Sequence, residues 1–223
     1  MDSAAELDQV HDRIAHACRI AKRDVADVNL IAVSKTHPVE KIEPVLAAGH
    51  RLFGENRVQE AAEKWPTLRE RYDGVELHLI GQLQSNKAED AAALFDVIHS
   101  LDRPSLLKAL AKAYDKLGRR VPCFIQVDVG EEEQKGGCAI ADLPALIERA
   151  RDADIPLLGL MCIPPFDKEP APFFALLGEL ARRHEPEPGA WGLSMGMSGD
   201  YETAIMLGAT HIRVGSAIFG ERG

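Results

Sequence analysis

One lysine of this sequence stands where a strand is expected to end. Lys35 follows the apolar run at 30–34 and precedes Thr36 and His37, which places it at the carboxyl end of that strand. Partial burial and a neighbouring cation disfavour the charged form of a lysine, and a neutral amine can form an imine with a carbonyl compound. The alternative is an ordinary solvated lysine at a strand end.

Arg213 lies inside another apolar run, at 211–215, and is expected to face inward. Alternation along a strand puts His211, Arg213 and Gly215 on one face and the aliphatic residues between them on the other. A guanidinium cannot shed its charge, so an inward arginine needs a partner. That partner is either a neighbouring acid in a structural ion pair or a bound ligand.

Two loops rich in glycine and serine could hold an anion. The first spans 194–200 and contains Ser198, and the second is Gly215 with Ser216. Glycines allow close backbone approach, so successive N–H groups can surround a phosphate. Each loop alone could be a flexible connection. Together with a rim lysine and an inward arginine, the two loops predict a site for a phosphorylated aldehyde.

Some other polar residues near the expected strand ends have less certain roles. Asn56 and Asn86 could donate hydrogen bonds to such a ligand, although turn formation and helix capping explain Asn86 better. His78, His99 and His211 have no metal-binding spacing. We expect these three to be hydrogen-bonded strand residues and not catalysts.

Hydrophobic periodicity predicts the elements that must bring these residues together. Short apolar runs alternate with amphipathic stretches, which indicates parallel strands joined by helices. The expected strands lie at 30–34, 51–54, 76–80, 97–101, 122–129, 155–162, 191–195 and 211–215, and the expected helices at 3–22, 38–48, 57–71, 86–94, 104–117, 140–152, 171–184 and 200–207.

Eight strands favour an α/β fold with a single (β/α)8 TIM barrel domain over 1–223 and an extra N-terminal helix. A doubly wound open sheet is the alternative. In a barrel of this kind the carboxyl ends of the strands form the active face. The first and last strands are neighbours there, so Lys35 and Arg213 would meet across the barrel mouth.

Composition narrows the possible partners. Apolar residues make up 46% and charged residues 27%, as in an ordinary globular protein. A net charge of -9 without a dense Lys/Arg run argues against nucleic acid and anionic membranes as partners. The four cysteines have no metal-binding spacing, which argues against a zinc site and favours a reducing compartment. The sequence starts without a basic and apolar leader, so the cytoplasm is the expected location.

Seven segments resemble one known family. They are AVSKT at 32–36, FGENRVQE at 53–60, IGQLQSNK at 80–87, HSLDR at 99–103, IQVDVGEEEQKGG at 125–137, GLMCIPP at 159–165 and LSMGMSGDYETAIMLGATHIRVGSAIFGER at 193–222. They occur in order over nearly the whole chain. They are similar to segments of the pyridoxal-phosphate homeostasis protein family, which is related in fold to the barrel domain of alanine racemase.

The resemblance implies a cofactor and the residues that hold it. Pyridoxal 5'-phosphate (PLP) would be bound to Lys35, its phosphate would contact Ser198, Gly215 and Ser216, and Arg213 would lie at or near the pyridine nitrogen. The implied role is to carry or balance the cofactor in the cell with little or no catalytic turnover. Candidate partners are PLP-dependent apo-enzymes, and we expect a monomer.

Two other functions compete with this one: an amino-acid racemase and a lysine-imine aldolase. Racemisation by two bases needs a second proton acceptor besides Lys35. In the related racemase a tyrosine of a C-terminal domain and the partner subunit supplies it, and this sequence, ending at Gly223, is not expected to have that domain. Tyr201 is the one tyrosine expected near the rim. Arg213 at the ring nitrogen would also weaken the electron sink that racemisation needs, whereas an aldolase leaves Arg213 without a clear role.

The sequence departs from the family pattern at two positions. Arg57 stands where the family often has tyrosine, and Leu77 stands where an aromatic residue commonly precedes the histidine. Neither belongs to the lysine, the Ser198 loop or the Arg213 strand. We therefore expect an intact cofactor site and altered contacts near the second strand.

Overall fold

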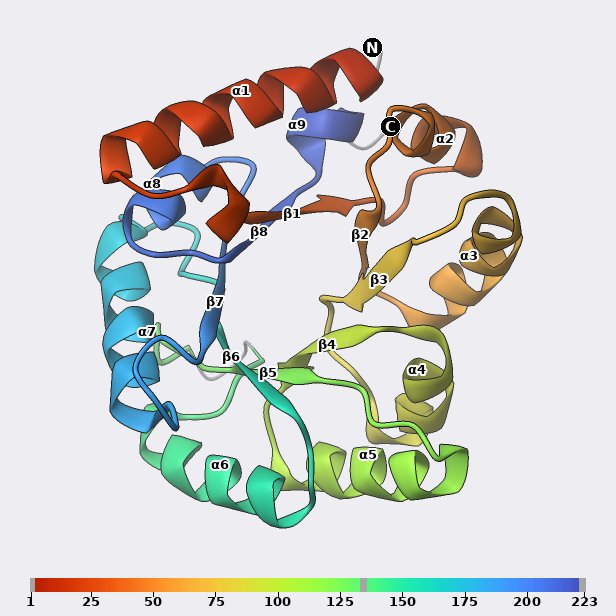
Figure 1. Ribbon diagram of the computed structural model, residues 1–223. Helices are drawn as coiled ribbons and strands as arrows, with labels where there is room; N and C mark the ends of the chain where they lie inside the picture. Colours follow the sequence, from red (N-terminus) through yellow and green to blue (C-terminus); the bar gives the residue numbers. More distant parts are fainter. Residues whose placement is uncertain (1–2, 133–135, 221–223) are drawn as a thin grey trace.

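The computed structural model, which describes residues 3–132 and 136–220, contains eight parallel strands closed into a barrel (Figure 1). The strands are β1 (Asn29–Val33), β2 (Leu52–Glu55), β3 (Glu76–Leu79), β4 (Val97–Leu101), β5 (Cys123–Gln126), β6 (Leu157–Met161), β7 (Gly192–Met197) and β8 (His211–Val214). Each strand pairs with the next, and β8 pairs with β1, with Arg213 opposite Ile31. The predicted (β/α)8 fold is confirmed, and the open sheet is excluded. Residues 133–135 and 221–222 of the family segments lie outside the described residues.

Helices surround the barrel (Figure 1). They are α1 (Ser3–Ala21), α2 (Val39–Ala47), α3 (Val58–Arg71), α4 (Ala88–Leu94), α5 (Pro104–Leu117), α6 (Leu143–Asp152), α7 (Ala171–His184), α8 (Tyr201–Met206) and α9 (Ser216–Phe219), with 3-10 turns η1 (Val25–Asp27), η2 (Ser85–Lys87) and η3 (Ile140–Asp142). The extra N-terminal helix α1 packs against α2, α8 and α9. The short α9 directly after β8 was not predicted, because four residues show no hydrophobic period.

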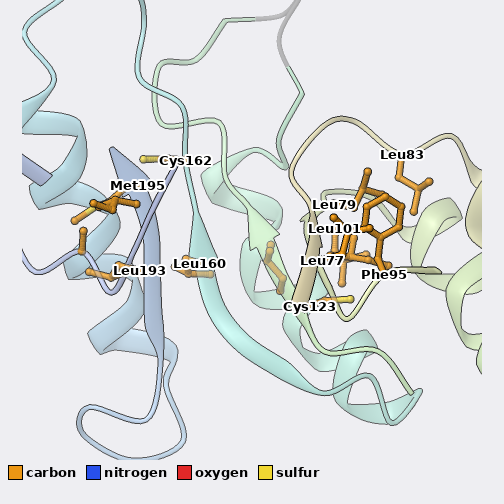
Figure 2. Packing of buried hydrophobic residues seen from close by; sticks show 14 of the residues in the cluster. Leu77, Leu79, Leu83, Phe95, Leu101, Cys123, Leu160, Cys162, Leu193 and Met195 are labelled. Carbon is orange, nitrogen blue, oxygen red and sulfur yellow. The ribbon is translucent and has the colours of Figure 1, made fainter. Parts of the chain in front are cut away.

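Alternation along the strands separates an outer core from the barrel interior. On β3, Leu77 and Leu79 face outward beside Phe95, and Leu193 and Met195 of β7 belong to the same hydrophobic cluster farther round the barrel (Figure 2). Each such buried side chain stabilises the fold by about 2 kcal/mol. The residues between them in the sequence point the other way, so the same alternation sends polar side chains into the barrel.

The barrel interior is unusually polar and aromatic at mid-height. TIM barrels are ordinarily filled by branched aliphatic side chains. Here the ring of His99 stacks on Phe124 with centroids 4.5 Å apart, and Phe124 meets the ring of His211 at 5.0 Å. His78 and His99 are also hydrogen-bonded to each other. The structure thus makes these histidines hydrogen-bonded strand residues, as predicted.

Two strand ends differ from the expectation. The apolar run at 122–129 predicts one long strand, but β5 ends at Gln126 and only Val127 continues in an isolated bridge to Cys138. Val127 and Val129 are apolar because they are buried in the hydrophobic core, and not because they belong to a strand. Conversely, β7 extends to Met197, since the chain stays paired with β8 as far as Arg213.

Candidate functional site

A cavity of about 560 Å³ opens at the carboxyl ends of the strands. Its lining includes all six residues that the sequence singled out, namely Lys35, Asn56, Ser198, Arg213, Gly215 and Ser216. These residues come from the ends of β1, β2, β7 and β8. The volume is within the range of about 300–1,000 Å³ that is usual for small-molecule sites. The fold therefore brings the predicted residues together in one place.

Arg213 forms the floor of the cavity. Its side chain is buried, with Nη1 donating to Ser194 Oγ at 2.6 Å and Nη2 donating to the carbonyl of Cys162 at 2.9 Å. Burial lowers the pKa of this guanidinium. Among the described residues no carboxylate lies within ion-pair distance of it, so its protein partners are neutral. The structural ion pair considered from the sequence is not formed within this part of the chain.

The Ser198 loop is fastened to the start of α9. Ser198 Oγ accepts hydrogen bonds from the backbone N–H groups of Gly215 at 3.1 Å and Ala217 at 3.4 Å. Gly196 in this loop has φ +90, and a Cβ there would meet Cβ of Ala204 at 2.5 Å, so only glycine fits. The two predicted anion loops therefore form one cradle at the β7–β8 side of the cavity.

Lys35 stands on a tightly held turn after β1. Thr36 has φ +64, a conformation that a β-branched residue adopts only when its surroundings enforce it. The N–H of His37 donates to the carbonyl of Ser34 at 3.1 Å, and Lys64 Nζ donates to the same carbonyl at 3.1 Å. This turn fixes where the half-buried side chain of Lys35 enters the cavity.

A buried carboxylate lies behind that turn. Glu55 of β2 accepts hydrogen bonds from Ser34 Oγ at 2.7 Å and Trp65 Nε1 at 3.1 Å, and its Oε1 pairs with Lys64 Nζ at 2.7 Å. Burial raises the pKa of Glu55, and the neighbouring Lys64 opposes that shift. This pair could not be predicted from the local sequence, because Lys64 lies on α3 and only the folded structure brings it to the end of β2. The FGENRVQE segment, which contains Glu55, was the available signal.

Asn56 and Asn86 differ as expected. Asn56 lines the cavity, and Gly81 packs so closely against it that a Cβ would lie 2.3 Å from its carbonyl oxygen. Asn86 belongs to the turn η2 and does not line the cavity. Its position in a turn agrees with the turn chemistry expected from the sequence. Arg57 is exposed and Leu77 is buried in the outer core, so neither family departure reaches the cavity lining.

The polar side chains on the wall opposite the Ser198 cradle were not among the residues predicted from the sequence. Gln82 Nε2 donates to Gln126 Oε1 at 2.7 Å, and Gln126 Nε2 donates to the carbonyl of Gly136 at 2.9 Å. Asp128 also lines the cavity on this side. Gln126 follows Phe124 by two residues, so strand alternation could have identified it as inward. Asp128 follows the end of β5, where the predicted strand was too long.

Comparison with known proteins shows the family to which this chain belongs. The family described as "Alanine racemase, N-terminal domain" matches residues 10–223. A pyridoxal phosphate homeostasis protein of Aquifex aeolicus is 39% identical over 100% of this chain and 99% of its own length. The protein of that name from Pseudomonas aeruginosa is 41% identical over 98% of this chain and 95% of its own. The chain belongs to the pyridoxal phosphate homeostasis protein family.

A solved structure is also similar to this chain over most of its length. PipY of Synechococcus elongatus, described as having PLP bound, superimposes with a TM-score of 0.81 at 38% identity, covering 95% of this chain and 100% of PipY. The family resemblance inferred from the seven segments is therefore confirmed. Within residues 3–132 and 136–220, none of the helices combines the length and the apolar character that a membrane span requires. The same residues contain no group of three His, Cys, Asp or Glu side chains that could hold a metal ion.

Proposed function

We propose that this protein of the pyridoxal phosphate homeostasis family holds PLP as an imine on Lys35 and keeps it available to other proteins with little or no catalytic turnover. The observation that carries the proposal is Arg213, whose buried guanidinium faces the cavity with only neutral protein acceptors among the described residues. A buried charge of this kind is stabilised when a ligand supplies a further acceptor. The ring nitrogen of PLP is such an acceptor.

The rest of the cavity fits the other parts of the cofactor. The cradle formed by Ser198, Gly215 and Ser216 would hold the phosphate, since it offers hydroxyl groups and close backbone approach. Asn56 would donate to a ring substituent from the end of β2. Lys35 would attack the aldehyde carbon, and the carbonyl oxygen would leave as water when the C=N bond forms.

Bound PLP supplies an aromatic ring that can withdraw electrons from an attached amine. Arg213 limits that ability here, because a guanidinium only donates hydrogen bonds and keeps the ring nitrogen unprotonated. The chain thus offers a grip for the cofactor together with a weakened electron sink. Relatives named for homeostasis, and PipY with PLP bound, support the carrier role.

A racemase is the second candidate, and the cavity argues against it. Two-base racemisation needs a second proton acceptor opposite Lys35, and a tyrosine is the residue expected to supply it. Tyr72, Tyr114 and Tyr201 all lie outside the cavity lining. Tyr201, expected near the rim, is instead fully buried, and its hydroxyl has no hydrogen-bond partner among the described residues. An aldolase would leave the buried Arg213 without a role.

Absorption and covalent labelling test the site. The purified protein loaded with PLP should be yellow, and borohydride should bleach it and leave a phosphopyridoxyl mass on the peptide that contains Lys35. Lys35→Ala should abolish the label, whereas Lys87→Ala, at an exposed ion pair with Asp90, should leave it unchanged. A label on Lys41 or Lys87 would overturn the assignment of the imine.

We further propose that the protein is a monomer and that it passes PLP to apo-enzymes. Gel filtration would test the monomeric state, and reactivation of an apo-enzyme would test the transfer.

A further inference from the structure

Below the cavity, four polar side chains connect Arg213 to the opposite end of the barrel. Arg213 Nη1 lies 2.6 Å from Ser194 Oγ, and this oxygen lies 2.8 Å from His99 Nδ1. His99 Nε2 lies 2.7 Å from His78 Nδ1, and His78 Nε2 lies 2.9 Å from Glu76 Oε1. We call this set, from Glu76 to Arg213, the interior chain. It crosses the barrel from the start of β3 to the cavity floor.

The two ends of the interior chain set the direction of its hydrogen bonds. A guanidinium has no acceptor, so Ser194 Oγ accepts from Arg213, and an ionised carboxylate has no donor, so Glu76 accepts from His78 Nε2. With one proton on each ring, His78 Nδ1 then accepts from His99 Nε2. His99 Nδ1 in turn accepts from Ser194 Oγ. This arrangement satisfies all four contacts.

The charges at the two ends support this arrangement. The hydrogen bond from His78 lowers the pKa of Glu76, which is half exposed, so the outer end of the chain is an ionised carboxylate. Burial lowers the pKa of His99 well below its usual value, which keeps that ring neutral. His211, whose pKa burial lowers to about 4, lies beside both rings at 6.2 Å but bonds to Thr210 and not to the chain. Near Arg213 the thiol of Cys162 has its pKa raised to about 12 by burial and stays neutral too.

The interior chain thus gives the buried cation an indirect counter-charge. Arg213 has no carboxylate partner among the described residues, yet aligned dipoles lead from it to an anion. Hydrogen-bonded side chains in a low-dielectric interior polarise one another, so a change at one end is felt at the other. Ser194 is the contact that fixes the guanidinium from below, and its hydroxyl is oriented by His99.

We propose that the interior chain orients and electrostatically supports Arg213 toward the cofactor ring, so that His99, His78 and Glu76 are positioning residues for cofactor binding. This inference rests on the proposed function for the ligand, although the chain itself can be tested without it. The ordinary alternative is a set of buried polar groups that satisfy one another and leave Arg213 unaffected.

The tautomers of the histidines provide the test that needs no cofactor. Nitrogen-15 NMR spectra of the unliganded protein at pH 7 should show His78 and His99 both neutral and both protonated on Nε2. A proton on Nδ1 of either ring, or a charged ring, would break the deduced direction and overturn the proposal. Because PLP is absent, this result stands even if the wild-type protein fails to load the cofactor on Lys35, which would overturn the proposed function instead.

Matched variants test the effect on Arg213. His99→Phe removes the acceptor for Ser194, and we expect the dissociation constant for PLP to rise about tenfold, with a shifted absorption maximum. His211→Phe alters a histidine of the same interior layer outside the chain and should change that constant less than about twofold. His99→Gln, whose amide can accept from Ser194 and donate to His78, should restore binding to within about threefold. Equal losses in the two Phe variants, or no rescue by Gln, would overturn the proposal.

A substitution of Glu76 provides the test if the His99→Phe variant does not fold. Glu76→Leu removes the last acceptor at a half-exposed position, so the fold should survive. We expect PLP binding about threefold weaker, because His78 loses its fixed tautomer. Glu89→Leu, which removes an exposed carboxylate paired with Lys116, is the control. Identical PLP binding in these two variants would show that the chain does not reach the cofactor.

Discussion

Arg213 and Ser194 meet across the seam between β7 and β8, with Nη1 2.6 Å from Oγ. Ser194 is paired in the sheet with His211, two residues before Arg213, and the register shifts between Ser194 and Met197. The guanidinium therefore reaches down the barrel, and not straight across a strand pair, to find its acceptor. It is held from below by a neutral hydroxyl while it lines the cavity above.

Replacing Arg213 should separate binding from folding. We expect Arg213→Ala to weaken PLP binding at least about tenfold and to shift the absorption maximum. Its melting temperature should change little, because the substitution also removes a buried charge without an ionic partner. Titration with PLP and thermal denaturation measure the two effects, with Arg183→Ala, an exposed pair with Glu179, as the control. An unfolded variant whose folded fraction binds PLP normally would make Arg213 a structural residue.

The Glu55–Lys64 pair should be required for stability at neutral pH. Lys64→Met leaves the buried carboxylate of Glu55 without its cation, which should cost about 3–5 kcal/mol of unfolding free energy. Burial raises the pKa of Glu55 above its value in the unfolded chain, so this loss grows as pH rises through the folded pKa. Denaturant titrations of the variant should therefore show a smaller loss at pH 5 than at pH 7.5.

The double variant provides the control for that pair. In Lys64→Met with Glu55→Gln both charges of this pair are gone, so most of the lost stability should return and its pH dependence should vanish. The exposed pair Lys87–Asp90 offers a comparison, since Lys87→Met should change stability by less than about 1 kcal/mol. A loss in Lys64→Met that is the same at both pH values would assign it to packing.

The architecture and part of the cavity lining could be predicted from the sequence, because both depend on local periodicity. Apolar runs mark strands, alternation decides which side chains face inward, and strand ends share one rim, so Lys35, Ser198 and Arg213 could be placed together. The contacts behind them could not be predicted. His99 and Ser194 are 95 residues apart, and their hydrogen bond depends on how the strands stagger in the closed barrel. Lys64 reaches Glu55 only through the way α3 packs.

Acidification should destabilise the protein before its carboxylates titrate. Burial lowers the pKa of His50 and His211 to about 4 and that of His99 well below its usual value. Histidines of the unfolded chain take up protons near pH 6.5, so stability is complete above that pH and falls as pH drops toward 4, by up to about 3 kcal/mol for each histidine. Thermal denaturation across this window measures the effect.

Single substitutions identify the histidines responsible for that loss. His50→Gln should flatten the pH profile, because the amide can still donate to the carbonyl of Leu52 but takes up no proton in the unfolded chain. His16→Gln, at an exposed position, should leave the profile as it is in the wild type. Equal profiles for the wild type and His50→Gln would place the source of acid sensitivity elsewhere.

The last prediction concerns turnover. We expect the PLP-loaded protein to pass its cofactor to an apo-enzyme and to show negligible racemase or transaminase activity on common amino acids. Lys35 is one base, and none of the described residues that line the cavity is a tyrosine that could act as a second. The measurement follows deuterium exchange at the α-carbon together with chirality, and slow exchange with retained chirality fits a site with one base.

Rapid loss of chirality that depends on Lys35 would overturn the carrier function. It would then require a second proton acceptor in the cavity, and the residues placed to supply one are His37 and Asp128. His37→Gln and Asp128→Asn would identify which of the two acts, because each keeps a similar shape while removing the proton acceptor. If neither variant lowered the rate, the second base would have to lie outside the described residues that line the cavity.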